Sequence, residues 1–177
     1  MRAFLASVVA VSAGFGLLGS VAAAKSSAVH YKYCVGVVLK LEPQAEDANR
    51  YTITRQKGGD WVPYGTATFD EMRRLVSQEV TGHGTLSFDP HNCEKTVGLC
   101  TYTETGFDGE SIEKLRINGR EGDEWNYSVM TSETQELLMI GTVTYGADGL
   151  ADRDEWTELD STRSGCFERI PPPESEG

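Results

Sequence analysis

The second half of the chain alternates between short runs of apolar or β-branched residues and clusters of turn-forming residues. The runs recur at the interval of about 8–12 residues that is typical of short strands joined by turns. They predict strands at residues 97–104, 112–118, 125–130, 137–145 and 155–159. Asp108-Gly109 lies between the first two runs and suits a tight turn, because both residue types tolerate positive φ. The pattern therefore predicts an antiparallel β-meander, which needs no crossover helices.

The most regular alternation lies nearer the N-terminus, at residues 29–41. Seven apolar or aromatic residues fall on one face there: Val29, Tyr31, Tyr33, Val35, Val37, Leu39 and Leu41. A period of two over this length predicts one long strand with a single buried face. Residues 51–55 alternate again and are expected to pair with this strand, and residues 85–88 predict a further short strand.

One segment, at residues 68–80, has the pattern of a helix. Thr68 and Glu71 are spaced as a capping box, in which each side chain satisfies a free backbone donor. The apolar residues that follow recur at helical spacing: Phe69, Met72, Leu75, Val76 and Val80. Such a stripe is typical of a helix packed on a sheet.

These elements predict a single, mainly β domain at residues 25–170. We expect about eight antiparallel strands in a curved or barrel-like sheet, with the helix at 68–80 on one side or at one end. A two-sheet β-sandwich is the alternative. Residues 171–177 are rich in Pro and Glu and predict a mobile tail.

The first 24 residues have the pattern of a secretory signal peptide. Arg2 precedes an apolar run at residues 3–18, and Ala22-Ala23-Ala24 offers a small-residue cleavage site. The run is too short for a typical membrane anchor. We therefore expect an exported protein, located in a periplasm or outside the cell.

The charge of the chain narrows the range of partners. Cleavage after Ala24 would remove Arg2 and leave 15 basic against 27 acidic residues, so the net charge would change from −11 to −12. Such an acidic surface repels phosphate backbones and anionic lipids, which disfavours nucleic-acid and membrane-surface binding. No second apolar segment is long enough to span a bilayer, so no membrane insertion is expected after cleavage.

All four cysteines follow the signal peptide. An even number of cysteines in an exported chain predicts two disulfides, and three pairings are possible. We favour Cys34–Cys166, which would tie the first strand to the last segment, and Cys93–Cys100, which would close a small loop. A metal site built from all four thiolates is disfavoured, because no two cysteines have the close spacing of zinc ligands.

Two stretches could carry chemistry. His83, Asp89 and His91 could hold a divalent metal ion or act as general acids and bases, although their spacing matches no established ligand pattern. Asp148, Asp152 and Asp154 could bind calcium, but the stretch lacks the spacing of an EF-hand and is typical of a solvated turn.

Trp61 and Tyr64 lie in an extended segment that contains Gly and Pro residues, and they are candidates for an exposed binding surface.

No nucleophile elbow, phosphate loop or dinucleotide motif occurs in the expected mature chain, and no cofactor is expected. The sequence thus favours a non-enzymatic binding or interaction protein, whose partner is a small molecule or an extracytoplasmic protein. Two alternatives stay open: a hydrolase that uses His83, Asp89 and His91, and a secreted inhibitor or envelope assembly factor that acts by protein contact.

Overall fold

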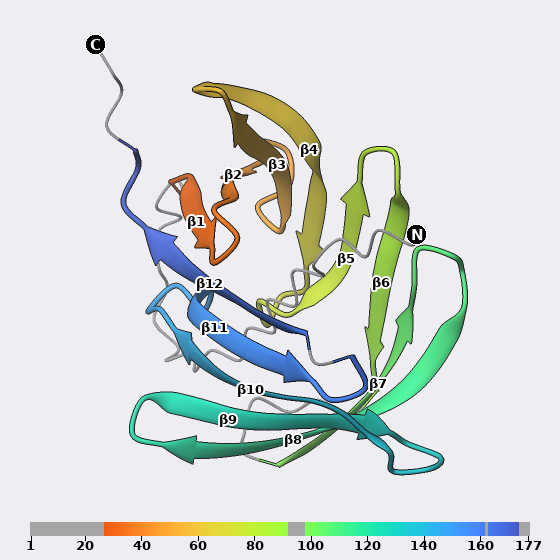
Figure 1. Cartoon of the computed structure of the whole chain (residues 1–177). Helices are drawn as coiled ribbons and strands as arrows, with labels where there is room; N and C mark the ends of the chain where they lie inside the picture. The colour runs from red at the N-terminus through yellow and green to blue at the C-terminus, as the bar shows by residue number, and fades with distance from the viewer. Residues whose placement is uncertain (1–26, 92–97, 162, 174–177) are drawn as a thin grey trace.

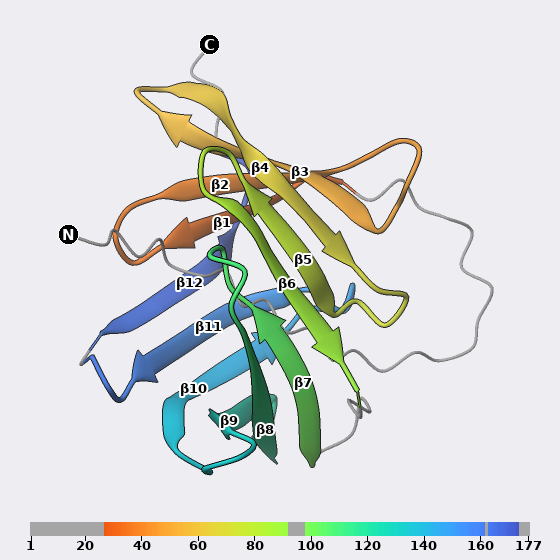
Figure 2. The ribbon, with the colours of Figure 1, turned by 90° about the vertical axis from the view of Figure 1, so that its right-hand side faces the viewer.

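The computed structural model describes residues 27–91, 98–161 and 163–173. These residues form twelve strands, each hydrogen-bonded antiparallel to the next, and the last pairs with the first to close a barrel (Figures 1 and 2). The strands are β1 (Val29–Tyr33), β2 (Val38–Pro43), β3 (Arg50–Lys57), β4 (Asp60–Phe69), β5 (Leu75–Val80), β6 (Gly84–Pro90), β7 (Leu99–Thr105), β8 (Ser111–Glu121), β9 (Glu124–Thr131), β10 (Leu137–Tyr145), β11 (Ala151–Glu158) and β12 (Ser164–Ile170). The predicted meander and barrel-like sheet are confirmed. The number of strands is larger than predicted, and the two-sheet sandwich is wrong.

The predicted long strand at residues 29–41 is wrong, because a turn divides it into β1 and β2. Gly36 has a φ of 81°, and the amide of Tyr33 donates to the carbonyl of Val37 at 2.8 Å. The turn preserves the alternation: Val29 and Tyr31 point inward before it, and Leu39 and Leu41 point inward after it. Apolar residues therefore recur at every second position through the turn as well as in both strands, and the sequence pattern gives no sign that the turn is there.

The predicted helix at residues 68–80 is also wrong. Its first residues end β4, its last residues form β5, and a turn joins the two strands. Oδ1 of Asp70 accepts hydrogen bonds from the amides of Met72 and Arg74, both at 2.9 Å. The polar residues at the start of this segment thus stabilise a hairpin turn instead of a helix terminus.

Two features of this hairpin explain the helical pattern. Gln78 occupies an inward position of β5 and is only 3% exposed, so a polar residue stands where alternation requires an apolar one. The register between β4 and β5 also shifts between Thr68 and Phe69, which changes the phase of the alternation.

The residues that the structure describes contain no helix. Accordingly, none of them belongs to a helix long and apolar enough to cross a membrane.

The interior lined by β1 to β6 and β12 is apolar and aromatic. The ring of Phe167 lies 5.2 Å from that of Tyr31, and the ring of Tyr51 lies 5.4 Å from that of Phe69. A cavity of about 10 Å³ remains between these strands, beside Gln78. This is near the smallest space that can hold one water molecule, so the side chains around this cavity leave almost no free volume between them.

The disulfide Cys34–Cys166 is confirmed. It joins the β1–β2 turn to β12 over a separation of 132 residues, with a Cα–Cα distance of 5.5 Å. A structural disulfide suggests an oxidising, extracytoplasmic environment. Cys93, residues 1–24 and residues 174–177 lie outside the described part of the chain, and with them the Cys93–Cys100 bridge, the signal peptide and most of the tail.

Candidate functional site

The structure does not bring the two predicted histidines together. His83 lies in the turn before β6, and His91 follows the opposite end of that strand. Eight extended residues span about 26 Å, so one ion cannot bind both side chains. His91 and Asp89 are both exposed, and Nε2 of His91 lies 2.9 Å from Oγ1 of Thr103. Within the described ranges, no three His, Cys, Asp or Glu side chains are grouped so that they could hold a metal ion.

Trp61 and Tyr64 point to opposite faces of β4. The ring of Trp61 lies outside the barrel, 5.6 Å from the ring of His30 and 5.1 Å from Nζ of Lys40. Tyr64 packs against the core, with the guanidinium of Arg55 5.6 Å from its ring. The two side chains therefore form no common surface, and a binding role for either one stays a prediction.

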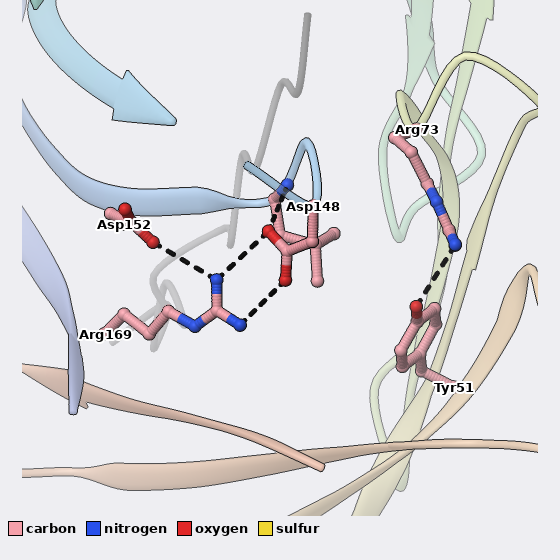
Figure 3. A network of polar contacts seen from close by, with 6 residues as sticks. Tyr51, Arg73, Asp148, Asp152 and Arg169 are labelled. Atoms are coloured by element: carbon pink, nitrogen blue, oxygen red, sulfur yellow. Dashed lines mark hydrogen bonds and ion pairs between the residues drawn. The ribbon is translucent and has the colours of Figure 1, made fainter. Parts of the chain in front are cut away.

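The acidic stretch after β10 is not simply a solvated turn. Nη1 of Arg169 donates to Oδ1 of Asp148 at 3.0 Å and to Oδ1 of Asp152 at 3.2 Å, and its Nη2 donates to Oδ2 of Asp148 at 2.7 Å (Figure 3). Partial burial acts to raise the pKa of Asp148, but hydrogen bonds from Arg169 and from the Leu150 amide outweigh it and lower that pKa. The three side chains join the β10–β11 turn to β12, which is a structural role.

A second polar group fills the interior between β8, β9 and β11. The guanidinium of Arg116 lies 4.0 Å from the ring centroid of Tyr127, whose hydroxyl donates to Oδ1 of Asp154 at 2.9 Å. Arg116 and Asp154 are 3% and 1% exposed. Burial raises the pKa of Asp154 to about 6, while the Tyr127 hydrogen bond and the charge of Arg116 act in the opposite direction.

Polarity is reversed along β8 relative to the apolar half of the barrel. Its inward residues include Lys114, Arg116 and Asn118, and its outward residues include Leu115 and Ile117. Lys114 pairs with the inward Glu104 at 2.7 Å. The interior of this part of the sheet therefore offers polar partners, and apolar side chains are displaced to the outer surface.

These outward residues belong to a larger apolar surface, which we call the outer patch. It consists of Leu99, Leu115, Ile117, Met130, Leu137, Ile140 and Leu159. Five of the seven are 40–58% exposed, and Leu115 and Met130 are half-buried. The patch lies on β7 to β10 and on the residue after β11, in the lower half of Figure 1.

The strand register places all residues of the outer patch except Leu159 in two neighbouring rows. The first row runs from Leu99 through Ile117, Ser128, Ile140 and Thr157 to Ser164. The second row runs from Thr101 through Leu115 and Met130 to Leu137. Six adjacent strands extend over about 24 Å, and neither row contains a charged residue. The rows therefore form a continuous uncharged surface across the sheet.

An open groove adjoins the first row. It has a volume of about 560 Å³ and is lined by Cys34, Asn126, Ile140, Gly141, Thr142, Glu155, Trp156, Thr157, Ser164, Gly165 and Cys166. Its volume lies in the range of ligand-binding sites, but its openness to solvent suits a polypeptide or another extended ligand better than an enclosed small molecule. The side chains that line it can form hydrogen bonds and apolar contacts, and they include no imidazole and no free thiol.

Sequence reasoning identified the side chains of this surface only in part. The alternation of residues 112–118 places Leu115 and Ile117 on one face of the predicted strand, but nothing in the local pattern specifies that this face is the outer one. The closed strand register determines the orientation, and pairings between distant residues set that register. No protein-family model, curated protein or solved structure matches this chain.

Proposed function

We propose that this chain is an exported, non-enzymatic interaction protein that binds a protein partner through the outer patch. The observation that carries the proposal is the contiguity of the seven apolar residues on the outside of a closed barrel. Single exposed apolar residues are common on soluble proteins, but contiguous apolar surfaces mark interaction sites. A partner that covers the outer patch would remove these side chains from water.

Two further features support an interaction through the outer face. The interior cavity beside Gln78 has room for about one water molecule, so this cavity offers no space for an organic ligand. The groove is continuous with the outer patch through Ile140 and could receive a segment of the same partner. The signal-peptide pattern of residues 1–24 and the disulfide support export, with the partner in a periplasm or outside the cell.

The experiment compares a patch variant with a matched control. The double substitution Ile117→Glu and Ile140→Glu places charges on two exposed positions of the first row, so the fold is expected to persist. Thr52→Glu introduces a charge on the exposed outer face of β3, on the other half of the barrel. Each tagged protein is expressed in the native source and purified without reductant after chemical cross-linking.

We expect wild type and Thr52→Glu to retain the same partner in near-stoichiometric amounts and the double variant to lose it. Circular dichroism and the midpoint of urea unfolding verify that each variant is folded. A partner retained equally by the folded double variant, or a wild type that purifies without a partner, would overturn the proposal.

A further inference from the structure

We infer that the partner presents apolar residues flanked by Lys or Arg, so that the outer patch is a docking surface for a basic, amphipathic polypeptide segment. This inference rests on the proposed function and specifies the chemistry of the partner. It depends on how charged side chains are distributed between the two faces of β7 to β10.

All three basic residues of β7 to β10 point inward. They are Lys114, Arg116 and Arg120 of β8, which share a face with Tyr102, Val129 and Trp125 of the neighbouring strands. Lys114 pairs with Glu104, Arg116 lies over Tyr127, and Arg120 lies 5.4 Å from the ring centroid of Trp125. Lys114 and Arg116 are held by the interior face of the sheet. Arg120 is partly exposed and also binds the carbonyl of Gly122 and the carboxylate of Asp123 in the β8–β9 turn, so none of the three cations lies on the outer face.

The charged residues on the outer face of the same strands are acidic. Glu113 lies in the row beyond Leu115, and Glu121 and Glu124 form a cross-strand pair at the far end of β8 and β9. All three are exposed, and none lies within ion-pair distance of a basic side chain that the structure describes, although the charge of Glu124 acts on Arg153 of β11 from further away. Carboxylates therefore flank the uncharged rows at both ends, a pattern complementary to an apolar segment with basic residues on either side.

The groove adds a further carboxylate to this surface. Glu155 is the one charged residue among those that line it, beside the hydroxyls of Thr142, Thr157 and Ser164. Nε of Arg153 donates to Glu155 at 3.1 Å, but both side chains are about half-exposed or more, and such pairs contribute little. A basic side chain of the partner could replace Arg153 there at low cost.

The same charges disfavour two other possible occupants of the outer patch, a second copy of this chain and an anionic lipid surface. In a symmetric dimer the patch would face its own copy, and the glutamates would face like charges. An anionic lipid surface would be repelled by the same glutamates and by the net charge of −11. A cationic polypeptide would meet neither of these repulsions, and its opposite charge would also speed its association with the patch.

Three fluorescein-labelled peptides test the inference by fluorescence anisotropy. One contains Leu and Lys, the second replaces every Lys with Glu, and the third keeps Lys but replaces every Leu with Ser. We expect the Leu/Lys peptide to bind at least about tenfold more tightly than either of the others, because it alone supplies both apolar contact and opposite charge. Its affinity should also fall between 20 and 200 mM NaCl, about tenfold, because the rim charges are exposed.

The charge variants are matched. Glu113→Gln, Glu121→Gln and Glu124→Gln together should weaken Leu/Lys binding about tenfold, the sum expected of three exposed pairs. The control combines Glu46→Gln, Glu71→Gln and Glu79→Gln, which change the net charge equally at exposed positions away from the patch. Equal losses in both triple variants, or equal binding of the Lys and Glu peptides, would overturn the inference.

The native partner separates this inference from the proposed function. If the Ile117→Glu and Ile140→Glu variant loses the partner but the patch charge variant retains it, the interaction function stands and the basic partner is wrong. Two other results would replace the basic partner with another occupant. They are a wild-type dimer in sedimentation velocity that the Ile substitutions abolish, and flotation of the protein with phosphatidylcholine vesicles.

Discussion

At the scale of single residues, Asp154 is a carboxyl group whose surroundings oppose its charge. It is 1% exposed, and burial raises its pKa to about 6 from an ordinary value of 3.8. The folded protein therefore binds the proton more tightly than the unfolded chain does between about pH 4 and pH 6. The contribution of Asp154 to stability is complete below pH 4 and is lost as the pH rises through this window.

Substitution of Asp154 by Asn removes this titration. The unfolding free energy of the wild type minus that of Asp154→Asn should fall by about 2 kcal/mol between pH 4 and pH 7, since each pKa unit corresponds to 1.36 kcal/mol and part of the change occurs below pH 4. Urea unfolding at pH 4, 5, 6 and 7 measures the difference. Asp123→Asn, in an exposed turn, serves as the control. A difference that does not change with pH for Asp154→Asn would contradict the prediction.

Gly141 is required by the close approach of its neighbours. A Cβ atom at this position would lie 2.6 Å from the carbonyl oxygen of Glu155, and it would also overlap the ring of Tyr127. Because the first of these contacts is with backbone, no side-chain movement relieves it.

We expect Gly141→Ala to lower the free energy of unfolding by about 1–3 kcal/mol, the usual cost of overpacking. Gly119→Ala is the control, since a Cβ there meets nothing within 4 Å. Its effect should lie within about 0.5 kcal/mol of zero. Equal unfolding midpoints for the two variants in urea would show that the sheet yields at Gly141.

At the scale of elements, the β4–β5 hairpin depends on Asp70. Its Oδ1 accepts two backbone hydrogen bonds, and its Oδ2 accepts one from Nε of Arg74 at 2.6 Å. Asp70→Ala should lower the free energy of unfolding by about 1–3 kcal/mol, because these donors lose their acceptor. Asp70→Asn keeps an acceptor oxygen and should cost less. Urea unfolding of both variants tests this order, and the reverse order would exclude the turn interaction as its cause.

The sequence was sufficient to predict the meander because neighbouring strands pair locally. The prediction for residues 137–145 coincides with β10, and turns such as Asp108-Gly109 are specified by their own residues. The hairpin at residues 68–80 was missed because an inward Gln78 and a register shift interrupt the alternation. The outer patch could not be located from the sequence. Alternation assigns residues to the two faces of a strand, but it does not show which face packs on the core.

At the scale of the whole molecule, Cys34–Cys166 closes a loop of 132 residues and holds β12 against the β1–β2 turn. The chain-entropy model gives such a bridge a contribution of about 5 kcal/mol. The double substitution Cys34→Ser and Cys166→Ser should therefore lower the unfolding free energy by several kcal/mol, measured in urea without reductant. An unchanged urea midpoint would mean that the disulfide does not restrict the unfolded chain and does not stabilise the folded barrel.

Closure of the barrel also brings the first and last strands side by side, although no covalent bond joins them along the backbone. His30 of β1 lies opposite Ile170 of β12, so the first and last strands are neighbours like any other pair. A short linker between them could move the chain ends to the exposed Gly58-Gly59 turn without disturbing a strand. In that permuted chain the disulfide would close a loop of about 20 residues, and its entropic contribution would fall to about 3 kcal/mol. The order in which the strands are synthesised would change, whereas the outer patch and its acidic flanks would keep their geometry.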